Sequence, residues 1–199
     1  LDIDTYFSDD VDERIVQESF NFKLVCDILP NVTLFTTDEK ERLDVAHKAF
    51  LANMSTLSDV EYRKEMERLG VDLSWKSSQI EGNTYSLLET ERPLKEKETA
   101  QGKTKEEAVM LLNHKDALDF ILDYPDYLKE LTVRRIEDIH SILTKELGVG
   151  SGIRKRRVGI TGTNYRPLDN EFKIREALED TCTLINGKEN VFEKALLAL

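Results

Sequence analysis

The residues with the most distinctive chemical spacing lie at 77–83, where the chain reads Ser-Ser-Gln-Ile-Glu-Gly-Asn. Ser77 and Glu81 are four residues apart, so they share one face of a helix, and Gly82 can adopt the left-handed conformation that ends it. The helix dipole disfavours a carboxylate at this end by a few tenths to about 1 kcal/mol. The pattern therefore predicts a cationic partner for Glu81 from elsewhere in the protein. The alternative is an ordinary exposed glutamate before a helix stop.

Other chemistry-bearing side chains form no catalytic or metal-binding pattern in the sequence. His47, His114 and His140 fall in helix-like stretches, and none stands at a recognised spacing from a nucleophile or a metal ligand. Cys26 and Cys182 are far apart and are predicted to be free thiols, as is typical of a reducing compartment. The sequence contains no Walker loop, dinucleotide fingerprint or kinase signature. We therefore predict neither a zinc site nor a disulfide framework.

Charge and hydropathy limit the classes of partner. The formal net charge of -11 argues against nucleic acid, because binding to a phosphate backbone needs clustered Lys and Arg. One basic run at 154–157 (Arg-Lys-Arg-Arg) departs from this acidic character, and a solvated loop or strand edge is its simplest interpretation. No apolar run is long enough to span a bilayer, and residues 1–10 show no secretory signal pattern. We expect a cytoplasmic location, without nucleic acid or membrane as partners.

The elements that must position these residues are mainly helical. Capping boxes, in which Ser or Thr precedes Glu by three residues, predict helix starts at Thr36, Ser58, Ser86 and Thr104. Apolar residues at helical spacing predict further helices over 133–147, over 172–186 and from about 190 onward. The charged stretch 89–105 is a candidate for a mobile connection. We predict an N-terminal helical region over 1–74 and a second region over 75–199.

One stretch after these helices changes period. Beyond Gly148 and Gly150 the apolar residues alternate, with Val158 and Ile160 on either side of Gly159. Turn-forming residues follow, namely Thr161, Gly162, Thr163 and Asn164. The pattern predicts a short β-hairpin whose turn uses Gly162 or Asn164.

The last helix is expected to continue beyond the printed sequence. Phe192, Ala195, Leu196 and Leu199 form an apolar stripe that is still running at the final residue, and no helix-stop signal follows it. We therefore expect a longer natural protein.

The segment Ser77-Ser-Gln-Ile-Glu81-Gly82-Asn83 resembles the inhibitory motif of the Fic family (Fic/DOC domain), in which Ser or Thr precedes Glu by four residues and Gly or Asn follows. The order of later elements is similar to that family's core: a helix centred on Asn113, a Leu-rich helix containing Ile139-His140, a hairpin flap, and a helix ending in Ile185-Asn186. The resemblance covers about residues 74–199. It implies a Fic-like helical bundle with one β-hairpin and an N-terminal helical extension.

The resemblance also implies an activity, that of a protein adenylyltransferase, which transfers AMP from ATP to a hydroxyl side chain of a target protein with the help of Mg²⁺. Glu81 would be the inhibitory residue, pairing with an arginine of the catalytic motif where the ATP γ-phosphate binds, and Ser77 and Gly82 would support it. The loop Thr161-Gly162-Thr163-Asn164 would lie against the nucleotide, and the strand from Val158 to Ile160 would hold the target. A homodimer is one assembly that the resemblance allows.

The sequence departs from the family in one respect that decides activity. The defining pattern HPF-x-D/E-GN does not occur in the 199 residues, so no catalytic residue and no metal ligand is assigned to this chain. We expect these residues alone to be inactive. Two alternatives stay open: a Fic-fold transferase with another donor or with phosphotransfer activity, and a noncatalytic helical interaction module.

Overall fold

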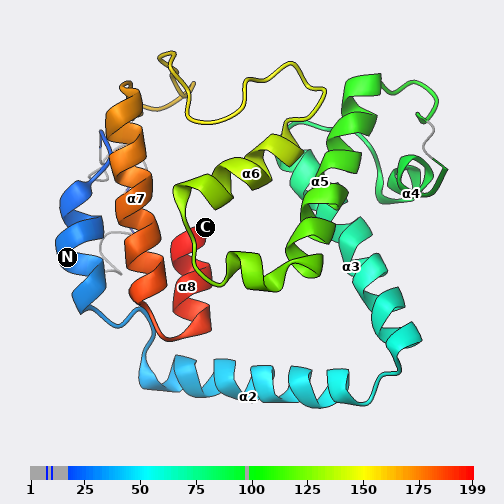
Figure 1. Cartoon of the computed structure of the whole chain (residues 1–199), viewed down its shortest axis with the longest axis horizontal. Coiled ribbons are helices and arrows are strands. Elements are labelled where there is room, and N and C mark those ends of the chain that lie inside the picture. The colour runs from blue at the N-terminus through cyan, green and yellow to red at the C-terminus, as the bar shows by residue number, and fades with distance from the viewer. Residues whose placement is uncertain (1–7, 9, 11–17, 97–98) are drawn as a thin grey trace.

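The chain folds into helices joined by loops, as predicted (Figure 1). The computed structural model describes residues 8, 10, 18–96 and 99–199. Within these ranges three short helices are not α-helical: the π-helix η2 (Leu24–Ile28) and the 3-10 helices η3 (Leu29–Asn31) and η4 (Pro125–Leu128). The α-helices are α2 (Thr37–Ser55), α3 (Asp59–Ile80), α4 (Leu87–Glu96), α5 (Lys105–Asp123), α6 (Val133–Leu143), α7 (Glu171–Gly187) and α8 (Val191–Ala198).

The helix starts lie where the capping signals placed them. Thr36, Ser58 and Thr104 each form a complete capping box at the start of α2, α3 and α5. Ser86 and Glu89 exchange the same pair of hydrogen bonds at the start of α4. These boxes form because each satisfies backbone N–H groups that the first helical turn leaves without partners. The predicted last helix is also confirmed, since the Asn190 side chain caps α8.

Two groups of helices make up the body of the molecule. In one group α3, α4 and α5 pack together and α5 also packs on α6, around a small buried cluster of Tyr85, Ala100, Ala108 and Leu111. In the other, α7 packs against η2, η3 and α8, and its contact with α6 joins the two groups.

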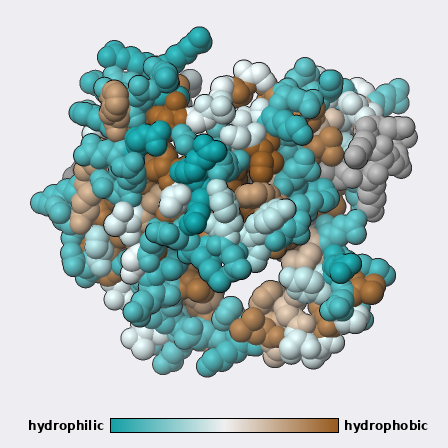
Figure 2. All heavy atoms as spheres, viewed as in Figure 1, coloured by the Kyte–Doolittle hydropathy of each residue, from teal (hydrophilic) through white to brown (hydrophobic). Residues whose placement is uncertain are grey.

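Helix α2 lies along one edge of the molecule and runs to the start of α3 (Figure 1). Its side chains are mostly exposed, and Val45, Phe50 and Leu51 keep 68%, 52% and 52% of their surface accessible. Apolar residues therefore reach the surface along this helix (Figure 2). In the middle of the helix, the His47 ring packs edge-on against Phe192 of α8, with the ring centres 5.8 Å apart.

The predicted β-hairpin requires correction, because the described residues contain no β-strand there. Val158 and Ile160 lie in an exposed loop, 49% and 54% accessible, and in the segment Thr161, Gly162, Thr163 and Asn164 only the first two residues form a turn. The returning arm bonds elsewhere: the Arg166 N–H donates to the Glu18 carbonyl at 2.7 Å, in a bridge between Ser19 and Arg166. Pro167 cannot donate the next bond of a ladder. The two arms therefore have no shared ladder to hold them together.

Other sequence predictions meet the structure as follows. The stretch 89–105 is helical up to Glu96, so it is not a simple mobile connection. The division between residues 74 and 75 falls within α3, and residues 1–7, 9 and 11–17 of the predicted N-terminal region lie outside the described residues. Cys26 and Cys182 are free thiols, as expected. No helix in the described ranges combines the length and apolar character needed to cross a membrane.

A buried ion pair fastens the N-terminal segment to the last two helices. The Lys188 ammonium and the Glu193 carboxylate are 3.9 Å apart, and both side chains are more than nine-tenths buried. Lys188 also donates to the carbonyls of Leu29 and Val32 at 2.7 and 2.8 Å, and Glu193 accepts from the Leu34 N–H at 3.0 Å. The two charges therefore satisfy backbone groups of a segment far away in sequence.

We predict that Glu193→Ala lowers the free energy of unfolding by about 3 kcal/mol, because it leaves the Lys188 ammonium buried without its counter-charge. Urea denaturation of the variant and the wild type measures this difference. Glu189→Ala, at an exposed glutamate of the same loop, is the matched control and should change stability by less than about 0.5 kcal/mol. Equal stability of the Glu193 and Glu189 variants would contradict the role given to the buried pair.

Candidate functional site

The end of α3 has the geometry that the sequence predicted for it. Gly82 adopts a left-handed conformation with φ +89°. Its N–H donates to the Gln79 carbonyl at 3.0 Å, and the Asn83 N–H donates to the Ser78 carbonyl at 3.0 Å. This pair of bonds is the Schellman motif, which closes the last turn of a helix and needs a residue that tolerates positive φ. Gly82 therefore fixes where α3 ends and where Glu81 lies.

Glu81 occupies the C-cap position of α3 and is exposed to solvent. Within the described ranges its carboxylate makes no hydrogen bond and no ion pair. His114 of α5 lies close enough to sense its charge: burial lowers the pKa of His114, and the negative charge of Glu81 opposes that shift. Because the pKa is lowered, the imidazole is mostly neutral at pH 7 and gives Glu81 no counter-charge.

The serines before Glu81 play different parts. Ser77 is half-buried, whereas Ser78 is fully buried and donates to the Trp75 carbonyl at 2.9 Å. Ser74, one turn earlier, is buried with its hydroxyl lacking a partner in the described part of the chain. Ser78 and Ser74 thus lie on the packed side of α3, while Glu81 is exposed to solvent.

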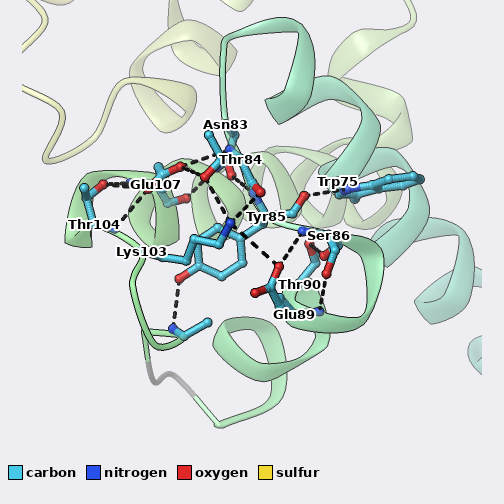
Figure 3. A network of polar contacts seen from close by, with 11 residues as sticks. Trp75, Asn83, Thr84, Tyr85, Ser86, Glu89, Thr90, Lys103, Thr104 and Glu107 are labelled. Atoms are coloured by element: carbon cyan, nitrogen blue, oxygen red, sulfur yellow. Dashed lines mark hydrogen bonds and ion pairs between the residues drawn. The ribbon is translucent and has the colours of Figure 1, made fainter.

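A polar network directly follows the motif, and the sequence did not reveal it (Figure 3). The Asn83 side chain donates from Nδ2 to the Glu107 carbonyl at 2.8 Å and accepts from the Tyr85 N–H at 2.9 Å. One asparagine therefore joins the end of α3 to the first turn of α5. A local sequence pattern could not reveal this link, because the Glu107 partner of Asn83 lies 24 positions further along the chain.

The carboxylate of Glu107 is the centre of this network. One oxygen accepts from the Thr84 N–H at 2.9 Å and from the Thr84 hydroxyl at 2.5 Å. The other accepts from the Thr104 N–H at 2.9 Å and from the Thr104 hydroxyl at 3.1 Å. The bonds from Thr104 and Thr84 stabilise the charged form and lower the pKa of Glu107 to about 2. Glu107 therefore caps its own helix and also holds the chain that leaves α3.

Lys103 and Tyr85 complete the network around the chain that leaves α3. The Lys103 ammonium donates to the Thr84 carbonyl at 2.6 Å and lies 5.5 Å from the centre of the Tyr85 ring. Tyr85 is fully buried; its hydroxyl accepts from the Ala100 N–H at 3.0 Å, and its carbonyl accepts from the Trp75 indole at 2.9 Å. Helices α3 and α5 and the segment before Lys105 are thus fastened together immediately beyond Glu81.

Two asparagines that carry part of the family resemblance, Asn113 and Asn186, link helices to neighbouring segments. Asn113 of α5 is buried and donates to the carbonyls of Leu143 and Lys145 at 3.0 and 2.7 Å, at the end of α6. The Asn186 side chain forms two bonds with the backbone of Leu131, both 2.8 Å long. Their positions are therefore explained by satisfied backbone groups at helix ends.

The remaining predicted site residues lie in the loop between α6 and α7. In the described structure no hydrogen bond or ion pair joins this loop, with Val158, Ile160 and 161–164, to the segment 77–83. Gly162 has φ +80°, and the Thr163 hydroxyl accepts from the Tyr165 N–H at 3.1 Å. The described structure therefore shows no polar bond between the predicted inhibitory and flap residues.

Neither a metal-binding cluster nor a match to a known protein family identifies this site. Among the described residues, His, Cys, Asp and Glu side chains form no cluster that could hold a metal ion. Comparison of the chain with protein-family models, curated proteins and solved structures found no match in any of the three.

We predict that Glu107→Gln lowers the free energy of unfolding by about 1 kcal/mol at pH 7, as expected for loss of a charged capping partner. The pKa of Glu107 is lowered in the folded state, so its contribution is complete above its ordinary pKa of 4.5 and is lost as the pH falls toward about 2. The stability difference between wild type and variant should therefore shrink over this window.

Chemical denaturation at a series of pH values measures this difference. Glu106→Gln, which removes an exposed carboxylate from the same first turn of α5, is the matched control. A Glu107 variant that matches the Glu106 variant at pH 7 would show that the bonds to Thr84 and Thr104 contribute little.

Proposed function

We propose that this chain is the inhibitory and target-positioning part of a Fic-type protein adenylyltransferase. The supporting observation is Glu81, an exposed carboxylate without a counter-charge in the described chain, held at the C-terminal end of α3 by a rigid helix stop. The helix dipole disfavours a negative charge there. An arginine from the catalytic motif would relieve this penalty and would form a strong charge-assisted pair.

The surroundings of Glu81 suit a competitive role. An inhibitory carboxylate must be held at a fixed position, because it competes with the ATP phosphate for the same arginine. The outcome depends on the difference between the two binding free energies. The Gly82 stop and the network around Glu107 hold the chain on both sides of that position. His114 stays mostly uncharged at neutral pH because burial lowers its pKa, so it leaves the carboxylate available.

The proposed reaction is the transfer of AMP to a protein hydroxyl. The hydroxyl oxygen of the target forms a bond to the α-phosphorus of ATP, the bond from that phosphorus to the bridging oxygen breaks, and pyrophosphate leaves while a base takes the hydroxyl proton. The described residues offer no cluster for Mg²⁺, and we assign neither the base nor a step through the metal to this chain. Its own part is to compete with ATP through Glu81 and to present the loop 158–164 to the nucleotide and the target.

Two alternative functions stand beside this proposal. A Fic-type transferase with another nucleotide donor, or with phosphotransfer activity, would use the same inhibitory geometry. A noncatalytic interaction module is favoured by α2, whose apolar side chains are exposed along the edge of the molecule. AMP labelling separates the two classes.

We predict that Glu81→Gly in the protein at its natural length raises self-modification and target modification at least about tenfold, equivalent to about 1.4 kcal/mol. Removal of the carboxylate would free the arginine to bind the ATP γ-phosphate. Labelling rates with radiolabelled ATP at matched concentrations measure the effect. Residues 1–199 alone should give no labelling.

Two further variants separate charge from backbone effects. Glu81→Gln removes only the charge and should also activate. Gln79→Gly introduces the same backbone freedom at an exposed position two residues before Glu81 and keeps the carboxylate. This variant should leave the labelling rate unchanged. If folded Glu81 variants label at the wild-type rate, the segment 77–83 is an ordinary helix end and the inhibitory assignment is wrong.

A further inference from the structure

A groove lined by acidic and apolar side chains lies between the first half of α3 and the second half of α5. Its volume is about 570 Å³, within the range of clefts that bind ligand groups. Tyr62, Met66 and Leu122 supply apolar surface, and Tyr62 and Leu122 are each 43% exposed. Four carboxylates and two cations also line it: Asp59, Glu67, Asp119 and Asp123 against Arg63 and Lys115.

The carboxylates of this groove are largely uncompensated. Lys115 is paired with Asp119 at 2.5 Å within α5. In the described part of the chain, Asp59, Glu67 and Asp123 form no ion pair. With four carboxylates and two cations, the groove has an excess of two negative charges beside exposed apolar side chains, which suits a segment that carries both cations and apolar groups.

The chain itself contains such a segment. Residues 154–157 are the only run of four consecutive cations in the sequence, and Ile153, Val158 and Ile160 flank them. Lys155 pairs with Glu171 at 3.6 Å and Arg157 with Asp169 at 2.9 Å, but both cations are more than 80% exposed, so these pairs are weak and exchangeable. Arg154 and Arg156 form no ion pair with any described residue.

This basic loop lies away from the groove of its own molecule. Figure 1 shows the loop between α6 and α7 along the top of the view, whereas the first half of α3 and the second half of α5 lie on the lower side. We propose that the loop 153–160 of one copy docks in the α3–α5 groove of a second copy. Two reciprocal contacts of this kind close a dimer, and the exposed apolar groups on both sides lose water on docking.

Charge complementarity makes the proposal testable in the 199-residue chain. Sedimentation velocity over micromolar to near-millimolar protein should show a concentration-dependent dimer that weakens between about 0.05 M and about 0.5 M salt. Reversal of the groove charges (Glu67→Lys with Asp123→Lys) or of the loop charges (Arg154→Glu with Arg156→Glu) should each weaken the dimer at least about tenfold, since like charges then face each other.

Mixing the two variants is the decisive measurement. In a mixed dimer one contact joins the native loop to the native groove, and the other joins the reversed loop to the reversed groove, so both contacts are complementary. The mixture should therefore dimerise more tightly than either variant does alone. Glu41→Lys with Asp44→Lys on exposed α2 changes the net charge in the same direction and by the same amount as the groove reversal, and it should leave the dimer intact. Circular dichroism confirms that each variant is folded.

Three results would overturn the proposal. A wild-type chain that stays monomeric at low salt excludes self-association. A dimer that survives both reversals, or a mixture that stays monomeric, places the contact elsewhere. If the wild type is monomeric but a labelled peptide of residues 151–162 binds the groove, the groove serves a basic segment of a different protein.

Discussion

The hydrogen bonds to the Glu107 carboxylate are the constraint on which the arrangement of α3, α4 and α5 depends. Two donors come from Thr104, at the start of the helix that carries Glu107, and two come from Thr84, on the chain leaving α3. Because one rigid group accepts all four, the end of one helix is fixed relative to the beginning of another. The buried Tyr85 side chain lies between them, and Lys103 covers its ring.

Glu81 and Glu107 show how position on a helix decides what a carboxylate does. Glu107 lies at the N-terminal end of α5, where unpaired N–H groups and the positive end of the dipole stabilise its charge. Glu81 lies at the C-terminal end of α3, where the backbone presents carbonyl groups and therefore no hydrogen-bond donor to a carboxylate. It stays exposed and without a counter-charge in the described structure. The contrast is what makes Glu81 available to a partner and Glu107 a structural residue.

Much of the remaining structure is held by single polar side chains at helix ends. Asn113 and Asn186 each satisfy backbone groups of a neighbouring segment, and the Lys188–Glu193 pair does so for the segment before α2. Such links suit a chain whose buried apolar cluster is small, because an unsatisfied buried backbone group costs about as much as the bond is worth. The loop between α6 and α7 is held less firmly: residues 155–160 are exposed, and the ion pairs of Lys155 and Arg157 lie at the surface.

The sequence by itself determined the helices and the end of α3, because capping boxes, Asn caps and the Gly82 stop act between residues at most five apart. These local bonds need no partner from a remote part of the chain. Tertiary structure alone decided that Asn83 and Thr84 meet Glu107, that His114 lies beside Glu81, and that Arg166 bonds to Glu18 in place of a hairpin partner. Each of these contacts joins positions that are remote in sequence, and only the packing of the helices chooses among the many partners that a polar side chain or a free backbone N–H could take.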